Sequence, residues 1–310
     1  MPMATDRRSF IKQAVLTSAS AALALGSSTA VAADAPAAQN AVPSGKIRDM
    51  QIGRILLGGN LLTHYTHSRD LQYVYNLTKH YNTKEKIFDT MALAESFGVN
   101  AVVIHTAPNV LDMMKEYRQK RKGKMKWIVC STGNIENPAE YANALRYMVD
   151  AGVDAAYIWG VQTDGLAATG KVSVIAKAVE TAKSLGIPCG VGAHELIVIE
   201  ECERVKVPAD FYIKTLHHHN YPSAKLEHDS MWCKNPRETI EFMKTVTKPW
   251  IAFKVMAAGA IPPEDAFRYV FSQGADFSLA GMFDFEIADD VQIAKRVLAD
   301  LPPRSRPWHG

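Results

Sequence analysis

The chain has 310 residues, of which 47% are hydrophobic and 22% are charged, both ordinary values for a globular protein. This composition excludes a collagen-like, an intrinsically disordered and a polytopic membrane chain. Lys plus Arg number 35 against 32 Asp plus Glu, so the formal charge is only +3 and we expect no nucleic-acid partner.

The first segment has the features of an export signal. The pair Arg7-Arg8 precedes an apolar stretch of small residues, which ends in Ala30-Val31-Ala32, a typical cleavage pattern. This tripartite arrangement resembles a twin-arginine signal peptide over residues 1–32. The resemblance implies that the twin-arginine translocase is a partner during export and that the mature protein is periplasmic or secreted.

The segments that flank the main domain are short. Residues 33–50 begin rich in Ala, Pro and Ser and are expected as a flexible tether, and residues 303–310 are expected as a tail. No cysteine precedes Cys130 and the apolar stretch is too short for a convincing span, so we expect no stable membrane anchor. All four cysteines are expected as free thiols, because a chain exported by this route folds in a reducing compartment.

The main domain, residues 51–302, alternates apolar runs with amphipathic stretches. The runs expected as strands are eight: Arg54–Gly58, Ala101–His105, Trp127–Ser131, Ala155–Trp159, Pro188–Gly192, Phe211–Thr215, Trp250–Val255 and Phe277–Met282. Asn137-Pro138 and Asn235-Pro236 are typical helix starts between such runs. Single helices between strands imply parallel pairing, and eight units predict one (β/α)8 TIM barrel. A doubly wound open sheet is the alternative, but its glycine-rich fingerprint is missing.

Polar side chains gather in the segments after the strands, where a TIM barrel carries its active site. Histidines are especially frequent there. The residues expected to bind substrate all follow strand ends, and they are Asn60, His67, Arg69, His105, Gln162, Asp164, Asn220, Gly259 and Gly281. Trp159 and Trp232 are open to two interpretations, stacking on a sugar ring or simple burial.

Strand alternation predicts which side chains face the barrel axis. If the bulky Ile213 and Phe253 face the helices, Lys214 and Lys254 face inward from adjacent strands. His194 is expected to point inward from the fifth strand. The alternative for either lysine is a position at the rim, in water or beside a carboxylate.

A pair of buried lysines suggests covalent chemistry. A lysine amine attacks a carbonyl only when it is deprotonated, and its pKa of about 10.4 must be lowered by burial or by a second cation. The prediction is that Lys214 forms a Schiff base, that Lys254 depresses its pKa and that His194 moves protons.

Two motifs carry a family resemblance. Asp210-Phe211-Tyr212-Ile213-Lys214-Thr215 and the stretch Phe253–Ile261 resemble the sixth and seventh strands of deoxyribose-phosphate aldolase, a class I aldolase. The resemblance implies an imine on Lys214 that is tuned by Lys254. It predicts a lyase acting on a small carbonyl or sugar-like substrate, with no nucleotide cofactor.

Two other classes of function remain open. His194, His217 and His218 could surround Zn²⁺ or Mn²⁺ in a metal-dependent sugar isomerase, epimerase or hydrolase. A fourth ligand would come from Glu195, Asp284 or His67. The third class is a binding barrel without chemistry, against which stands the concentration of titratable groups at one end of the strands.

Overall fold

The computed structural model describes residues 42–225 and 232–310. The expected signal peptide, residues 1–32, and the first part of the expected tether lie outside the described residues. Export and the domain boundaries therefore stay predictions. Within the described ranges, no helix combines the length and the hydrophobicity that a membrane span requires.

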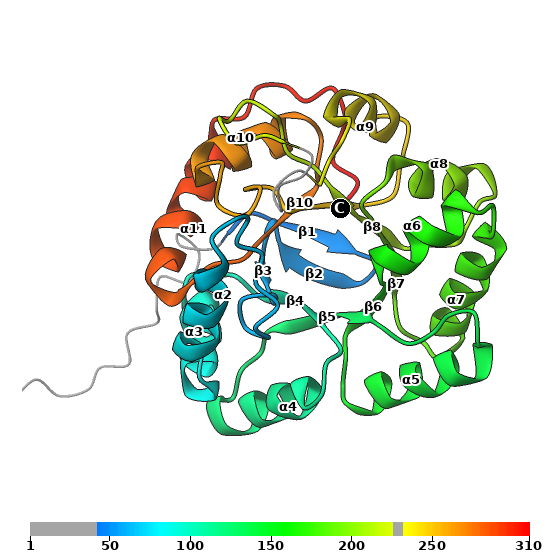
Figure 1. Cartoon of the computed structure of the whole chain (residues 1–310), viewed down its shortest axis with the longest axis horizontal. Coiled ribbons are helices and arrows are strands. Elements are labelled where there is room, and N and C mark those ends of the chain that lie inside the picture. The colour runs from blue at the N-terminus through cyan, green and yellow to red at the C-terminus, as the bar shows by residue number, and fades with distance from the viewer. Residues whose placement is uncertain (1–41, 226–231) are drawn as a thin grey trace, which may run out of the picture. The chain divides into compact units, whose positions relative to one another are not determined.

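Eight parallel strands close into a barrel in the order β10-β3-β4-β5-β6-β7-β8-β9, and helices surround it (Figure 1). The predicted (β/α)8 fold is confirmed. The barrel strands are β3 (Ile55–Gly58), β4 (Ala101–His105), β5 (Lys126–Ser131), β6 (Ala155–Ile158), β7 (Cys189–Ala193), β8 (Phe211–Thr215), β9 (Trp250–Phe253) and β10 (Phe277–Ala280). Each coincides with one of the expected apolar runs to within a few residues.

The helices form the outer layer of the barrel (Figure 1). They are α2 (Gln72–Tyr81), α3 (Lys84–Ser96), α4 (Val110–Arg121), α5 (Pro138–Asp150), α6 (Gly160–Ala168), α7 (Val172–Ser184), α8 (Leu196–Arg204), α9 (Pro236–Met243), α10 (Pro263–Ser272) and α11 (Asp284–Ala299). The expected cap Asn137 accepts a hydrogen bond from Glu140 N at the start of α5. Asn235 precedes α9 without such a bond.

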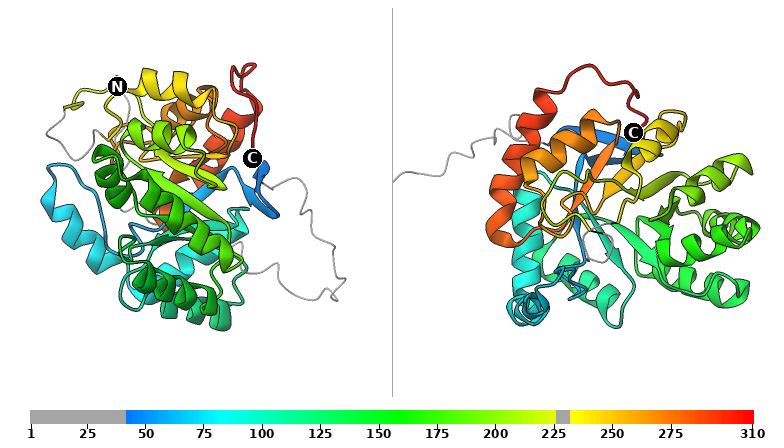
Figure 2. Two further views of the ribbon diagram at one scale, coloured as in Figure 1. Left: turned by 90° about the vertical axis from the view of Figure 1, so that its right-hand side faces the viewer. Right: turned by 45° about the horizontal axis from the view of Figure 1, so that its top comes forward.

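A hairpin covers the amino-terminal end of the barrel (Figure 2). Its strands β1 (Ser44–Ile47) and β2 (Met50–Gly53) pair antiparallel and use residues that the sequence assigned to the tether. Ile47 and Ile52 are fully buried in the same apolar cluster as the interior strand residues. The hairpin therefore extends the barrel core at this end.

In β8 and β9 the side chains alternate in the opposite sense to the predicted one. Phe211, Ile213 and Ile251 belong to the interior cluster, whereas Tyr212 and Trp250 pack among helix residues. The expected helix-facing orientation of the bulky residues in β8 and β9 is wrong. Both faces of a barrel strand are apolar, so bulk does not distinguish them.

The absence of a side chain at Gly190 on the neighbouring strand explains why the Phe211 ring fits inside the barrel. A Cβ added to Gly190 would lie 2.4 Å from a carbon of the Phe211 ring, so that ring occupies the space that a side chain on β7 would need. The orientation expected for β7, with Val191 and Ala193 toward the helices, agrees with their packing in the outer cluster. Cys130, Cys189, Cys202 and Cys233 are buried and free, as expected.

Candidate functional site

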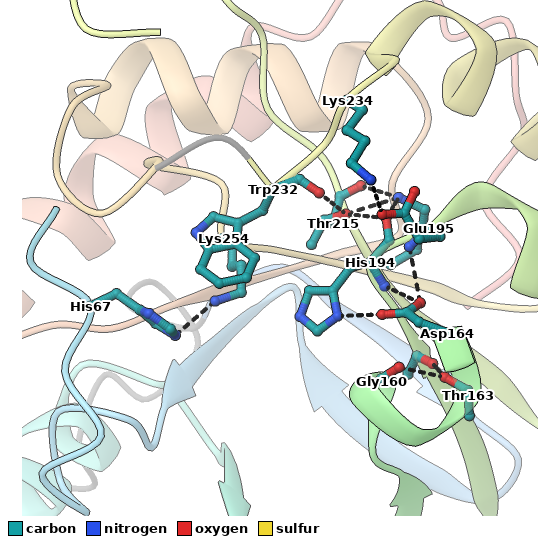
Figure 3. A network of polar contacts seen from close by, with 12 residues as sticks. His67, Gly160, Thr163, Asp164, His194, Glu195, Thr215, Trp232, Lys234 and Lys254 are labelled. Carbon is teal, nitrogen blue, oxygen red and sulfur yellow. Dashed lines mark hydrogen bonds and ion pairs between the residues drawn. The ribbon is translucent and has the colours of Figure 1, made fainter. Parts of the chain in front are cut away.

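A histidine-carboxylate pair stands at the carboxyl ends of two neighbouring strands. His194 directly follows β7, and Asp164 lies in α6, the helix after β6. His194 Nδ1 is 2.7 Å from Asp164 Oδ2, and Asp164 Oδ1 accepts the backbone N–H groups of His194 and Glu195, each at 3.0 Å (Figure 3). A carboxylate only accepts, so Nδ1 carries the proton. The ring is thereby fixed with Nε2 available for proton transfer.

Lys214 does not face the barrel axis. It shares the helix-facing side of β8 with Tyr212, and only 1% of it is exposed. Its ammonium group donates to His194 O at 2.7 Å, to Thr215 O at 3.1 Å and to Thr215 Oγ1 at 2.8 Å. These bonds join the carboxyl ends of β7 and β8, which indicates a structural role.

The electrostatic surroundings of Lys214 also differ from those expected. Burial lowers the pKa of Lys214, while Cys233, Asp164 and Glu195 act in the opposite direction. Lys254 is not among the causes. A second cation therefore does not depress the pKa of Lys214, and the predicted lysine pair in one cavity is not formed.

Lys254 lies at the mouth of the barrel in a group of rings. Its ammonium group donates to His67 Nε2 at 2.8 Å and lies 3.6 Å from the centre of the Trp232 ring, a cation–π contact (Figure 3). Lys254 has φ 57°, the left-handed region, directly after β9 ends at Phe253. The turn, and not strand alternation, therefore directs this side chain to the mouth.

The same rings connect Lys254 to His194. The Trp232 ring is 5.4 Å from the His194 ring and 5.0 Å from the His67 ring, measured between centroids. The Phe253 ring is 5.5 Å from that of His194. A cation and a polarised imidazole thus share one aromatic wall, and this group is the candidate site.

The histidines after β8 hold their own loop. His217 Nε2 accepts from Trp232 N at 3.0 Å and from Cys233 N at 3.1 Å, and its Nδ1 donates to His218 O at 3.0 Å. Burial lowers the pKa of His217 to about 4, so the ring is neutral. His219 Nε2 donates to Cys233 O at 2.6 Å. Two imidazoles therefore fix the segment that carries Trp232.

The predicted metal centre is wrong. Both ring nitrogens of His217 are engaged, and His218 Nε2 is 3.2 Å from Asp265 Oδ2 instead of turning toward His194. Within residues 42–225 and 232–310, no three His, Cys, Asp or Glu side chains are arranged to hold a metal ion.

The loop after β3 contributes three of the expected residues. His67 contacts Lys254 as described, and the Nε atom of Arg69 is buried without a hydrogen-bond partner among the described residues. Asn60 is exposed, and its carbonyl accepts from Tyr65 N at 2.8 Å. The ring of His105, at the end of β4, lies 5.3 Å from the Tyr65 ring, measured between centroids, and burial lowers the pKa of His105.

The remaining expected residues lie away from this group. Gln162 donates to Gly133 O at 3.0 Å and accepts from Ile135 N at 3.3 Å, so it orders the segment after β5. Asn220 is exposed, and its backbone N–H donates to His218 Nδ1 at 3.1 Å. Gly259 has φ 82° in the turn after β9, and Gly281 faces Leu61.

Phe253 and Lys234 were not assigned to the site from the sequence. Phe253 was placed toward the helices by the inverted alternation, although it belongs to the aromatic wall. Lys234 and Glu195 form an ion pair of 2.5 Å beside the His194 backbone, which no motif marks. The pairing of Asp164 with His194 was accessible in principle, since both follow neighbouring strands.

Comparison with known proteins gives only structural matches. No family model and no curated protein matches this chain. A proposed aldo-keto reductase from Pseudomonas aeruginosa matches with a TM-score of 0.58 and 14% identity, covering 83% of this chain and 94% of the other. An aldo-keto reductase from Bacillus halodurans, in its holo form, matches with a TM-score of 0.54 and 10% identity, covering 84% and 97%.

These similarities correct the family drawn from the sequence. The matched barrels are aldo-keto reductases and not Schiff-base aldolases, so the resemblance to deoxyribose-phosphate aldolase is wrong. The physical reason is that the buried ammonium group of Lys214 donates hydrogen bonds to backbone carbonyls and does not face a substrate. The expected lyase and metal-dependent activities, and the expected absence of a nucleotide cofactor, conflict with these aldo-keto reductase neighbours. At these identities the similarity establishes the fold.

Proposed function

We propose that this chain is an oxidoreductase that interconverts a small carbonyl compound and its alcohol with a nicotinamide nucleotide. The observation that carries the proposal is the His194–Asp164 pair, which holds an imidazole with Nε2 available at the carboxyl end of the barrel. Similarity in fold to aldo-keto reductases over more than four fifths of the chain supports the class of reaction.

The residues at the mouth fit the proposed cofactor. A nicotinamide ring needs flat apolar neighbours, which Trp232 and Phe253 supply beside His194. The phosphates need cationic donors, and Arg69 supplies one, since its buried Nε has no hydrogen-bond partner among the described residues. These side chains would hold the cofactor, which supplies a hydride when bound.

In this proposal His194 transfers the proton. In carbonyl reduction the imidazolium form donates its Nε2 proton to the carbonyl oxygen while the carbonyl carbon gains the hydride. The C=O π bond is replaced by one C–H and one O–H bond, and neutral imidazole remains. Asp164 holds the ring in place through its contact with Nδ1. In alcohol oxidation the neutral Nε2 accepts the hydroxyl proton.

Lys254 contributes positive charge near the reacting oxygen. Negative charge grows on this oxygen as the hydride arrives, and a fixed cation stabilises it most when water is excluded. The contact with Trp232 and the bond to His67 hold the ammonium group in one position. We therefore assign Lys254 an electrostatic role and no covalent one.

The test is turnover by the purified mature chain. NADH or NADPH oxidation would be followed with a panel of aldehydes, ketones and keto-sugars, for the wild type and for His194→Ala. Loss of a positioned general acid lowers rates about 10²- to 10⁴-fold, and we expect this for kcat. The control is His80→Ala, an exposed histidine of α2. No turnover by the wild type, or equal rates for both variants, would contradict the proposal.

We also propose that residues 1–32 direct export through the twin-arginine route, on the sequence features alone. A reporter fused to residues 1–40 should reach the periplasm only in cells with a working twin-arginine translocase. Replacing Arg7 and Arg8 together by Lys should block transport, and normal transport of this variant would refute the proposal.

A further inference from the structure

An open surface cavity lies at the other end of the barrel from His194. Its volume is about 560 Å³, within the roughly 300–1,000 Å³ typical of small-molecule sites. It is formed by the last turn of α11 and the chain after it, where Leu298, Leu301 and three prolines supply apolar walls and Arg304 supplies the only charged side chain of the lining. Arg304 neighbours Arg54, which precedes β3, so this cavity is at the amino-terminal end and separate from His194.

Arg304 is the unusual residue of this cavity. All three nitrogens of its guanidinium group are buried, and none has a hydrogen-bond partner among the described residues. The group instead lies 3.3 Å from the centre of the Trp308 ring. Burial lowers the pKa of Arg304 to about 10, with Asp276 acting against this effect. A buried guanidinium without acceptors is unfavourable unless something supplies them.

The side-chain carboxylate of Asp276 is already engaged. Asp276 accepts from Trp250 N at 2.9 Å, from His309 N at 2.8 Å and from Arg306 Nη1 at 2.7 Å. Arg306 is fully buried and gives its other donors to backbone carbonyls. Three arginines therefore lie around the Asp276 side chain and Gly310, and the local excess is positive.

Arg54 does not relieve this excess. It donates to the backbone oxygen of Asp276 at 2.8 Å and to Gly310 O at 3.1 Å, and it lies 3.5 Å from the Trp308 ring centre. Because Arg304 approaches the same ring closely, two cations share one indole. An anion beside Arg304 would satisfy its donors and offset this repulsion.

We propose that this cavity binds a small organic acid, whose carboxylate draws the Arg304 guanidinium off the Trp308 ring and whose apolar body lies against the leucine and proline walls. A planar guanidinium matches a carboxylate in two parallel hydrogen bonds. The apolar lining distinguishes such a ligand from inorganic phosphate, which has no surface to bury there. The site is independent of the proposed reductase activity.

The test uses benzoate as the probe, with benzamide as its neutral isostere and inorganic phosphate as a purely polar anion. Calorimetric titration and thermal unfolding would be measured on the wild type, on Arg304→Gln and on Arg237→Gln, an exposed arginine of α9. We expect benzoate to bind and raise Tm, benzamide and phosphate to bind at least tenfold more weakly, and Arg304→Gln alone to lose benzoate binding.

Several outcomes would overturn the proposal. They are absence of benzoate binding, equal binding of benzamide, binding of phosphate as tight as that of benzoate, and an unchanged affinity in Arg304→Gln. If Arg304→Gln does not fold, the comparison of benzoate with benzamide on the wild type decides. None of these readouts depends on carbonyl reduction, so failure here is distinguishable from failure of the proposed function.

Discussion

Replacing Asp164 by Asn tests the pair at the centre of the candidate site. The amide oxygen can still accept the backbone N–H groups of His194 and Glu195, which Asp164 Oδ1 accepts at 3.0 Å. The amide nitrogen, however, would face His194 Nδ1 and donate to it. The neutral ring must then carry its proton on Nε2, and the imidazolium loses its counter-charge.

The magnitude follows from the geometry of this contact. His194 Nδ1 and Asp164 Oδ2 are 2.7 Å apart, and the two side chains are 17% and 18% exposed. A hydrogen bond to a charged group contributes about 1.5–3 kcal/mol net. Because about 1.36 kcal/mol changes a rate tenfold, we expect kcat/KM to fall about ten- to two-hundredfold in Asp164→Asn.

Two measurements check this expectation. Two-dimensional ¹H–¹⁵N correlation of the histidine rings reports the tautomer without any substrate, and it should show Nδ1–H for neutral His194 in the wild type and Nε2–H in Asp164→Asn. Steady-state kinetics of carbonyl reduction then give the loss in kcat/KM. An unchanged tautomer together with kcat/KM within twofold of the wild type would refute the reasoning.

Three further predictions concern buried ionisable groups and need only unfolding measurements. Burial lowers the pKa of His217 to about 4, so the contribution of its neutral ring to stability is complete above about pH 6.5 and is lost as pH falls toward 4. This shift is worth about 3 kcal/mol in the free energy of unfolding. Urea unfolding of His217→Gln should therefore depend less on pH in the acid range than that of the wild type. Burial also lowers the pKa of Lys214, so the folded state binds fewer protons and stability rises with pH up to about 10.5; Lys214→Met should remove this rise, whereas the exposed Lys177→Met should keep it. Arg306→Met leaves Asp276 buried without its 2.7 Å cation partner and should cost about 3–5 kcal/mol in denaturant unfolding, and a loss below about 1 kcal/mol would contradict that role.

The barrel could be predicted because its signals are local. Eight apolar runs, each followed by a helix whose start or end is marked by capping residues, can be recognised from short-range sequence patterns. The strand β4, for example, spans the expected residues Ala101–His105. Parallel pairing then follows from the single helices between strands. The amino-terminal hairpin was missed, since its strands have four residues each and carry a mixed polar pattern.

The direction of side chains was the weaker inference. Phe211 faces inward because Gly190 on the neighbouring strand leaves room for its ring, and this depends on the register between strands. Because Phe211 faces the barrel axis, Lys214 on the same strand faces the helices, and the predicted covalent mechanism no longer applies. Lys254 reaches the mouth for a different reason, the left-handed turn after β9.

The candidate site stands at the strand ends, where the sequence predicts it, but its pairings differ from the predicted ones. The sequence places Asp164 and His194 after neighbouring strands, yet a hydrogen bond requires their rotamers and the start of α6. The histidines after β8 looked like ligands, although His217 and His219 instead hold the segment of Trp232. Such a role depends on backbone groups fourteen to sixteen residues away, which composition and spacing do not reveal.

The central claim is that a nicotinamide nucleotide binds at the mouth of this barrel beside His194. The most direct measurement is a crystal structure of the mature chain grown with saturating NADP⁺ or NAD⁺. The account predicts the nicotinamide ring next to Trp232 and within hydride-transfer reach of a substrate held by His194 Nε2, with the carbonyl oxygen near Lys254 and the phosphates near Arg69. A crystal in which neither nucleotide binds, or in which one binds away from the carboxyl ends of the strands, would contradict it.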